Sequence, residues 1–154
     1  MSELVSVIVP CHNRKQYLRE CLNSLAQQTY HNIELIIVDD ASDDDIRSVI
    51  NEISFPFPHP PRYVRSDTNR GPGASRERGR LMAQGEYICY LDSDDLWHPE
   101  KVEAQVTALR NNPDAGMCYC KTAEFHQLPI TGHEELRQGN QRPVRSFLPQ
   151  VLYY

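Results

Sequence analysis

The stretch Tyr87–Asp95 is YICYLDSDD, a mostly apolar run followed at once by an acidic turn. Gly85 precedes the apolar run and Pro99 follows the turn, and a short run bounded in this way predicts a buried strand. A strand that ends in carboxylates presents them where open α/β sheets bind their ligands. Asp92 and Asp94 carry hard oxygen donors that suit Mg²⁺ or Mn²⁺ bridged to a phosphate. The alternative is a solvated acidic turn before a helix, and the rest of the chain decides between the two.

Two other apolar runs have the same form. Residues 4–9 (LVSVIV) lead into residues 10–13 (PCHN), and residues 33–38 (IELIIV) lead into Asp39 and Asp40. Near-continuous aliphatic runs of this length are typical of central strands in a parallel sheet, and we expect the first to stop at Pro10. Parallel strands share one direction, so the polar residues behind all three runs are expected at one edge of the sheet. There they predict a ligand cleft.

Apolar residues recur at helical spacing between the strand-like runs. The predicted helices span residues 14–28, 43–53, 73–84 and 99–110. Further short strands are predicted over residues 62–65 and 115–120, with residues 122–128 as a partner for the last. The proline-rich stretch 55–61 suits neither a helix nor a central strand, because its prolines lack amide donors. This alternation predicts an α/β fold with a three-layer α/β/α, mostly parallel, Rossmann-like sheet.

Length and composition restrict the class of protein. The 154 residues are enough for one domain with its own core. The net charge of −5 argues against nucleic acid as a partner. No stretch approaches the ~20 apolar residues of a membrane span, and we see no signal peptide. The five cysteines include no Cys-x-x-Cys pair, which favours reduced thiols over a zinc site. We therefore expect a cytoplasmic protein, or one bound peripherally at the cytoplasmic face of a membrane.

The paired acids Asp39 and Asp40 have two interpretations. Either can accept a hydrogen bond from a nucleobase imide or a ribose hydroxyl, or one of them only caps the following helix. Ser42 is a second candidate for that cap, with Asp43–Asp45 in the first helical turn, where the helix dipole favours acids. Bringing these acids together with the Asp92–Asp95 turn places like charges at one edge of the sheet. A bound divalent cation would relieve that repulsion.

Residues 69–76 (NRGPGASR) supply the opposite charge. The glycines let backbone amides approach a ligand, and the helix that starts here favours anions. Arg76 is expected to contact a diphosphate in bidentate geometry or to pair with one of the aspartates. The pattern is neither the dinucleotide-binding fingerprint nor a P-loop, so by itself it is weak evidence. His12 is left with two roles, a contact to a base or a structural one.

Several short motifs together resemble a known family. They are residues 6–14, 17–22, 28–30, 38–42, 69–71, 83–88 and 91–95. Their order and spacing resemble those of the large family of inverting nucleotide-sugar glycosyltransferases with the GT-A fold, of the family 2 type. The resemblance extends from about Val5 to Val106, and the combination of motifs is highly specific.

The resemblance implies a nucleotide-diphospho-sugar donor, with a UDP-sugar as the first choice, and Mn²⁺ or Mg²⁺. It also implies a saccharide, lipid or protein acceptor and a role in polysaccharide or cell-wall biosynthesis. By position, Pro10 and His12 would border the base, Asp40 would hold a uracil-type edge, and Asp94 would bind the metal. The expected nucleotide-sugar-binding residues are Pro10, His12, Asp39, Asp40, Gly71, Arg76, Asp92 and Ser93. The expected metal ligands are Asp92 and Asp94.

Three residues depart from the family's pattern. His12 stands where Tyr or Phe is frequent, Ala41 where Gly is common, and Glu77 where Asn commonly follows Arg76. The first two remove no expected ligand, whereas Glu77 would alter the donor pocket if its side chain reached it.

The resemblance also implies a general base that deprotonates the acceptor, in an acidic motif later in the chain. The only later acidic pair, Glu134-Glu135, comes too soon to align, so we expect the base beyond Tyr154. Residues 1–128 would then form the nucleotide-sugar-binding domain, and residues 129–154 the start of an acceptor-side region that is cut short. The alternative is a non-catalytic module that binds a nucleotide or nucleotide-sugar; a nucleotidyltransferase is a more distant third possibility.

Overall fold

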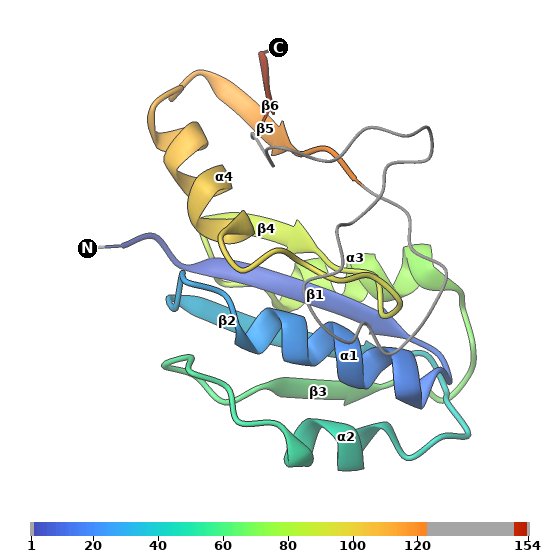
Figure 1. The fold of residues 1–154 in the computed structure, drawn as a ribbon. Helices are drawn as coiled ribbons and strands as arrows, with labels where there is room; N and C mark the ends of the chain where they lie inside the picture. The colour runs from blue at the N-terminus through green and yellow to red at the C-terminus, as the bar shows by residue number, and fades with distance from the viewer. Residues whose placement is uncertain (1, 123–149, 154) are drawn as a thin grey trace, which may run out of the picture. The chain divides into compact units, whose positions relative to one another are not determined.

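The structure, a computed structural model, describes residues 2–122 and the backbone of residues 150–153. The chain forms two compact units, Met1–Pro99 and Glu100–Tyr154 (Figure 1). The expected boundary between residues 128 and 129 lies outside the described residues. So do the acidic pair Glu134-Glu135 and, apart from residue 122, the strand partner predicted over residues 122–128. Within the described part of the chain, no helix is long and apolar enough to span a membrane.

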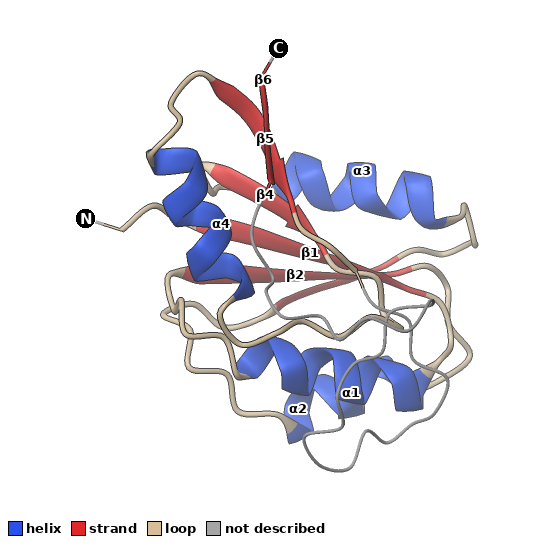
Figure 2. Cartoon of the chain, turned by 45° about the horizontal axis from the view of Figure 1, so that its top comes forward, coloured by secondary structure: helices blue, strands red, loops and turns tan. Residues whose placement is uncertain are grey.

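The first unit contains a four-stranded parallel sheet in the order β3-β2-β1-β4. Its elements are β1 (Val5–Cys11), α1 (Lys15–Ala26), β2 (Ile33–Asp39), α2 (Ile46–Glu52), β3 (Arg62–Arg65), α3 (Pro72–Met82) and β4 (Tyr87–Tyr90). Figure 2 shows α1 and α2 against one face of this sheet and α3 against the other. Every residue of β1 and β2 is buried, as their near-continuous apolar sequence predicts. The predicted three-layer α/β/α arrangement is confirmed.

Strand β1 continues through Pro10 to Cys11, whereas we expected it to stop at Pro10. Along β1, the carbonyl of Ile8 accepts the Leu91 amide from the β4 side, and the carbonyl of Cys11 accepts the Asp40 amide from the β2 side. Backbone groups alternate between the two neighbours, so the position of the missing Pro10 donor faces β4. Since β4 ends at Tyr90, opposite Ile8, the proline interrupts no ladder hydrogen bond there.

The second predicted helix starts later than expected. Helix α2 begins at Ile46, and the Asp45 side chain caps it by accepting the Ser48 amide at 3.1 Å. Ser42, our candidate for the cap, instead accepts the amide of Asn13 at 2.8 Å. The acids before Asp45 therefore precede the helix, because this turn is engaged with the loop after β1.

The second unit contains α4 (Lys101–Arg110) and the antiparallel pair of β5 (Ala115–Tyr119) and β6 (Gln150–Tyr153). Helix α4 starts two residues after Pro99, with Glu100 at its N-cap, so Pro99 does not occupy the first helical position as we expected. The strand predicted over 115–120 exists, but it pairs with β6 in a two-stranded sheet. Among the described strands, β5 is therefore not part of the parallel sheet, although the alternation of strands and helices in the sequence predicted that it would be.

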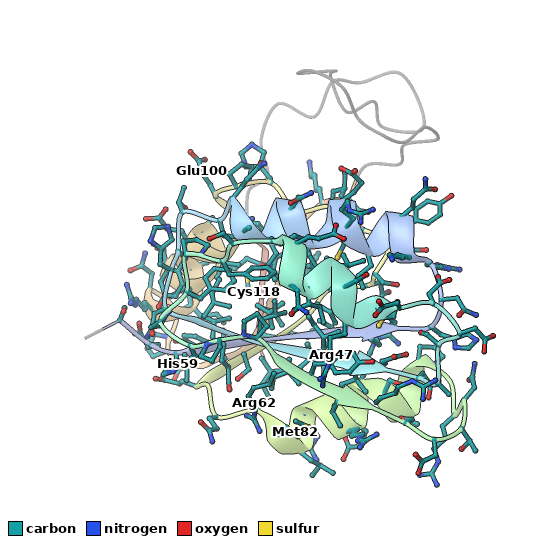
Figure 3. The ribbon with its side chains drawn as sticks, turned by 90° about the horizontal axis from the view of Figure 1, so that it is seen from below. Arg47, His59, Arg62, Met82, Glu100 and Cys118 are labelled. Carbon is teal, nitrogen blue, oxygen red and sulfur yellow. The ribbon has the colours of Figure 1, made fainter. Side chains whose placement is uncertain are left out.

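A buried carboxylate ties the first unit together at the end of α3. Glu34 of β2 is 3% exposed and accepts hydrogen bonds from the Ser6 hydroxyl at 2.5 Å, from the Gly85 amide at 3.0 Å and from the amide of Gln84. Arg62 of β3 lies 3.4 Å from the same carboxylate and donates to the Met82 carbonyl at 2.7 Å (Figure 3). Burial opposes ionisation of Glu34, but these donors outweigh it and lower its pKa below the ordinary 4.5.

We expect Glu34→Gln to lower the free energy of unfolding by about 1–3 kcal/mol at neutral pH, because buried donors lose a charged acceptor. The folded-state pKa lies below the unfolded value, so the ionised carboxylate stabilises the fold fully above about pH 4.5. That contribution is lost as the pH falls through the folded pKa. Urea unfolding from pH 7 to pH 3 should therefore show the difference between the two proteins shrinking on the acid side. A difference independent of pH would contradict this account.

Candidate functional site

A cleft of about 400 Å³ opens at the carboxyl ends of β1, β2 and β4. The chain passes from β1 to β2 and β3 on one side of β1, and then returns to place β4 on the other side. The loops after β1 and β4 therefore diverge, which is the usual position of a ligand site in an open α/β sheet. The cleft is lined by Pro10, Cys11, His12, Arg14, Asp40, Asn69, Gly71, Pro72, Ser75, Arg76, Asp92, Ser93 and Asp94. All the site residues expected from sequence are among them except Asp39.

Asp39 is buried in the sheet and does not line the cleft. Its carboxylate accepts the Ser42 amide at 2.9 Å and the Tyr63 hydroxyl at 2.6 Å, and it lies 3.5 Å from the Arg65 guanidinium. Burial first, and then the hydrogen bond to Asp39, raise the pKa of Tyr63 above its ordinary value, so the phenol stays protonated. Asp39 therefore organises the end of β2 and is not among the residues that we propose to contact the nucleotide.

Asp40, next in sequence, shapes one wall of the cleft. Its carboxylate accepts the amides of Gly71 at 2.7 Å and of Arg70 at 3.0 Å, which holds the loop before α3 against the end of β2. Gly71 has φ 85°, a conformation that glycine adopts without steric cost. A carboxylate offers about four lone-pair positions, so Asp40 keeps acceptor capacity toward the cleft.

His12 lies at the mouth of the cleft with both ring nitrogens engaged. Nδ1 lies 2.8 Å from the Asp40 carbonyl oxygen, which can only accept, so Nδ1 carries the proton. Nε2 lies 3.4 Å from the Asn13 side-chain nitrogen, a contact in which Nε2 accepts. The exposed ring is thus oriented by the loop and remains available to border a ligand.

Arg14 is a cleft residue that our sequence reasoning missed. Asn13 and Arg14 both have left-handed backbones, with φ 56° and 62°, and the loop is held by the Asn13 side chain accepting the Asp43 amide at 2.8 Å. Strained backbone of this kind persists where neighbours over-determine it, often at functional sites. From this position Arg14 forms an ion pair with Asp94. Its place directly behind the polar residues 10–13 is the signal that could have identified it.

The two acids of the Asp-x-Asp motif each face an arginine. Arg76 of α3 lies 2.5 Å from Asp92, one of the two roles predicted for it, and Arg14 pairs with Asp94. All four side chains are about one third to one half exposed, so each pair is weak and exchangeable. The guanidinium groups offset the repulsion that we expected between the gathered acids.

The donor set fits a divalent cation that shares its coordination with a ligand. Among the described residues, no group of three or more His, Cys, Asp or Glu side chains could hold a metal by itself. Mg²⁺ sites often use only one or two carboxylates and complete the coordination with substrate phosphates and water. Asp92 and Asp94 would supply the two carboxylates of such a site. Partial desolvation, which is the largest cause, and the negative charges of Asp92 and Asp94 raise the pKa of the neighbouring Asp95.

Two further residues have no direct chemical role in the cleft. Burial first, and then the charges of Asp39 and Asp40, raise the pKa of Cys11 to about 12, so its thiol is a poor nucleophile. Glu77 is exposed on α3, where it accepts hydrogen bonds from Arg80 at 2.7 and 2.8 Å. It is not among the residues that line the cleft, so its side chain does not reach the proposed donor pocket.

The chain is similar to known glycosyltransferases in sequence. An uncharacterized glycosyltransferase of Haemophilus influenzae is 39% identical over 116 residues, which are 75% of this chain and 38% of the relative. Glycosyltransferase GlyG of Streptococcus pneumoniae is 37% identical over 103 residues, 67% of this chain and 34% of that protein. The chain thus spans between a third and two fifths of the length of these relatives.

Solved structures have the same fold. Residues 1–349 of S. aureus TarS in complex with UDP-GlcNAc match with a TM-score of 0.66 at 30% identity, over 71% of this chain and 32% of that chain. Mannosyltransferase PcManGT of Pyrobaculum calidifontis in complex with GDP-Man and Mn²⁺ matches with a TM-score of 0.70 at 25% identity, over 80% of this chain and 36% of that chain. The model of the family described as Glycosyl transferase family 2 matches residues 6–152. The chain therefore belongs to glycosyl transferase family 2.

Proposed function

We propose that residues 1–128 form the donor-binding domain of an inverting glycosyltransferase that uses a nucleotide-diphospho-sugar and Mn²⁺ or Mg²⁺. Residues 129–154 would begin its acceptor-side region. The observation that carries this proposal is the cleft at the switch point of the sheet, with two carboxylates at the end of β4, each facing an arginine. The complexes of TarS with UDP-GlcNAc and of PcManGT with GDP-Man and Mn²⁺ support a donor of this class.

The two halves of the cleft suit the two halves of a nucleoside diphosphate. Pro10, His12 and Asp40 would border the base and ribose, and Asp40 offers an acceptor to an imide or a hydroxyl. Asp92 and Asp94 would hold the cation, which when bound neutralises charge on the diphosphate. Arg14 and Arg76 would exchange their carboxylate partners for phosphate oxygens, because a guanidinium binds both anions in the same geometry.

Transfer then requires a single displacement at the sugar. An acceptor oxygen forms a bond to the anomeric carbon on the face opposite the diphosphate, and the bond from that carbon to the phosphate oxygen breaks. The electron pair leaves with the nucleoside diphosphate, whose charge Arg14 and Arg76 would stabilise, and the configuration inverts. The acceptor proton passes to a general base, a role that we assign to none of the described residues.

The location proposed for this domain is the cytoplasm or the cytoplasmic face of a membrane. All five cysteines are free, and Cys11 and Cys21 are buried as thiols. Reduced cysteines are the rule in the cytosol.

Calorimetric titration tests the proposed function directly. We expect UDP to bind in the presence of Mn²⁺ with a Kd on the order of 10 μM, and at least about tenfold more weakly when the metal is chelated, because the diphosphate supplies metal ligands. GDP in the same titration distinguishes the base. Release of UDP from UDP-GlcNAc would separate a transferase from a module that only binds. A folded protein that binds neither nucleotide, with or without metal, would refute the proposal.

A further inference from the structure

Ser75 in the first turn of α3 has a buried hydroxyl without a partner. The residue is 2% exposed and lines the cleft. Its Oγ is the one buried side-chain polar atom, within the part of the chain that the structure describes, that makes no hydrogen bond. The backbone of Ser75 is satisfied, since its amide donates to the Gly71 carbonyl at 3.2 Å. The side-chain oxygen of this cleft-lining residue is left without a hydrogen bond.

An unpaired buried hydroxyl needs a physical reason. In a helix, serine often donates its hydroxyl to a carbonyl three or four residues earlier, and a carbonyl oxygen can accept a second hydrogen bond beside the one from the helix amide, yet the Ser75 hydroxyl makes no such bond. Alanine would favour the helix more than serine and would bury no polar atom. Gly79, one turn later, packs against Ile8 and brings this part of α3 close to the sheet, which shields Ser75 from bulk water. The unpaired hydroxyl thus lowers the free energy of unfolding of the ligand-free protein.

We propose that Ser75 donates a hydrogen bond to an oxygen of the bound nucleotide and so positions the donor in the cleft. This inference rests on the function proposed above. Ser75 lies on one wall between Gly71, which Asp40 anchors, and Arg76, which faces Asp92. A ligand oxygen in this part of the cleft can be a base carbonyl, a ribose hydroxyl or a phosphate oxygen, and each accepts from a serine hydroxyl. The bound nucleotide therefore supplies the hydrogen-bond acceptor that the Ser75 hydroxyl lacks in the free protein.

The substitution Ser75→Ala should move stability and affinity in opposite directions. Removing the unpaired hydroxyl should raise the urea midpoint of unfolding of the free protein, while the Kd for UDP with Mn²⁺ should rise about tenfold. Titrations with uridine and with pyrophosphate identify the accepting oxygen, since only the ligand that carries it should lose affinity. The control is Ser24→Ala, because the Ser24 hydroxyl donates to the Cys21 carbonyl at 2.7 Å and accepts the Trp97 amide at 3.1 Å, outside the cleft. It should lower stability and leave the UDP affinity unchanged.

Two results would overturn the inference while leaving the proposed function standing. One is an unchanged UDP affinity in Ser75→Ala while wild type binds UDP, which would mean that the nucleotide does not use the hydroxyl and would leave the proposed function intact. The other is a lower stability of Ser75→Ala, which would mean that the hydroxyl has a partner in the protein. If folded wild type binds no nucleotide, the proposed function fails, and this inference fails with it.

Discussion

Asp94→Asn is expected to weaken UDP binding in the presence of Mn²⁺ about 100-fold, with little effect on the unfolding of the protein. Loss of a direct metal ligand should reach at least the upper end of the 10- to 100-fold range typical of groups that only support a ligand. Asparagine keeps the shape of the side chain and removes the charge that a divalent cation needs. The fold tolerates the change because Asp94 and Arg14 are both about half exposed, and an exposed pair contributes little to stability.

The ratio of UDP affinities with and without Mn²⁺ is the informative measurement. In Asp94→Asn the Arg14 guanidinium loses its carboxylate partner and remains free to meet a phosphate, so metal-free binding should hold or tighten. The ratio should therefore fall close to one. Asp114→Asn is the matched control, because Asp114 is an exposed carboxylate in the turn before β5. If Asp94→Asn kept the wild-type ratio, the metal assignment would be wrong, whatever the nucleotide affinity.

The strand ends and the cleft were predictable from sequence because their signal is local. Apolar runs of strand length, each followed by polar residues, specify buried parallel strands, and parallel strands must end at a common edge. The position of Arg76 opposite the acids follows in the same way from a helix that starts behind a glycine corner. Each of these inferences needs only nearest neighbours in the chain and the shared direction of the strands.

The roles of Asp39 and Asp40 could not be separated in this way. Both are carboxylates at the end of one strand, and no local pattern distinguishes them. The Asp39 carboxylate contacts Tyr63 and Arg65 of β3. The Asp40 carboxylate instead accepts the amide of Gly71 in the loop before α3. These partners are 24 or more residues away in sequence. Such side-chain choices depend on tertiary packing, which overrides local rules.

The wrong prediction for Ser42 and the missed cleft residue Arg14 have the same cause, which is contact between residues that are distant in the sequence. Ser42 is a good cap by local rules, yet the amide of Asn13 engages it instead. Asn13 and Ala41 have left-handed backbones beside this contact between the two loops, and Arg14, next after Asn13, pairs with Asp94. Ala41 has φ 60°, so the departure from the family's usual glycine at this position costs backbone energy rather than a ligand. The unmet hydroxyl of Ser75 likewise becomes visible only once the partners around it are known.

Gly79→Ala is expected to lower the free energy of unfolding by about 2–3 kcal/mol or more, because α3 packs on β1 through this glycine. A Cβ at Gly79 would overlap the Cγ2 methyl of Ile8 and lie 3.3 Å from its Cγ1. Ile8 is fully buried in a central strand and is stiff about χ1, so it cannot turn aside. The helix itself would have to move. Chemical denaturation with urea measures the effect.

Gly73→Ala in the same helix is the matched control, since a Cβ there meets nothing within 4 Å. It should be neutral or stabilise the protein by up to about 1 kcal/mol, because alanine loses less conformational freedom than glycine in a helix. The pair of variants separates helix propensity from packing. Gly79 also lies one turn after Ser75 on the buried side of α3, so a displaced helix should weaken UDP binding as well. If Gly79→Ala were as stable as Gly73→Ala, the close packing of α3 on Ile8 would be refuted, and with it the shielding of the Ser75 hydroxyl from water by that packing.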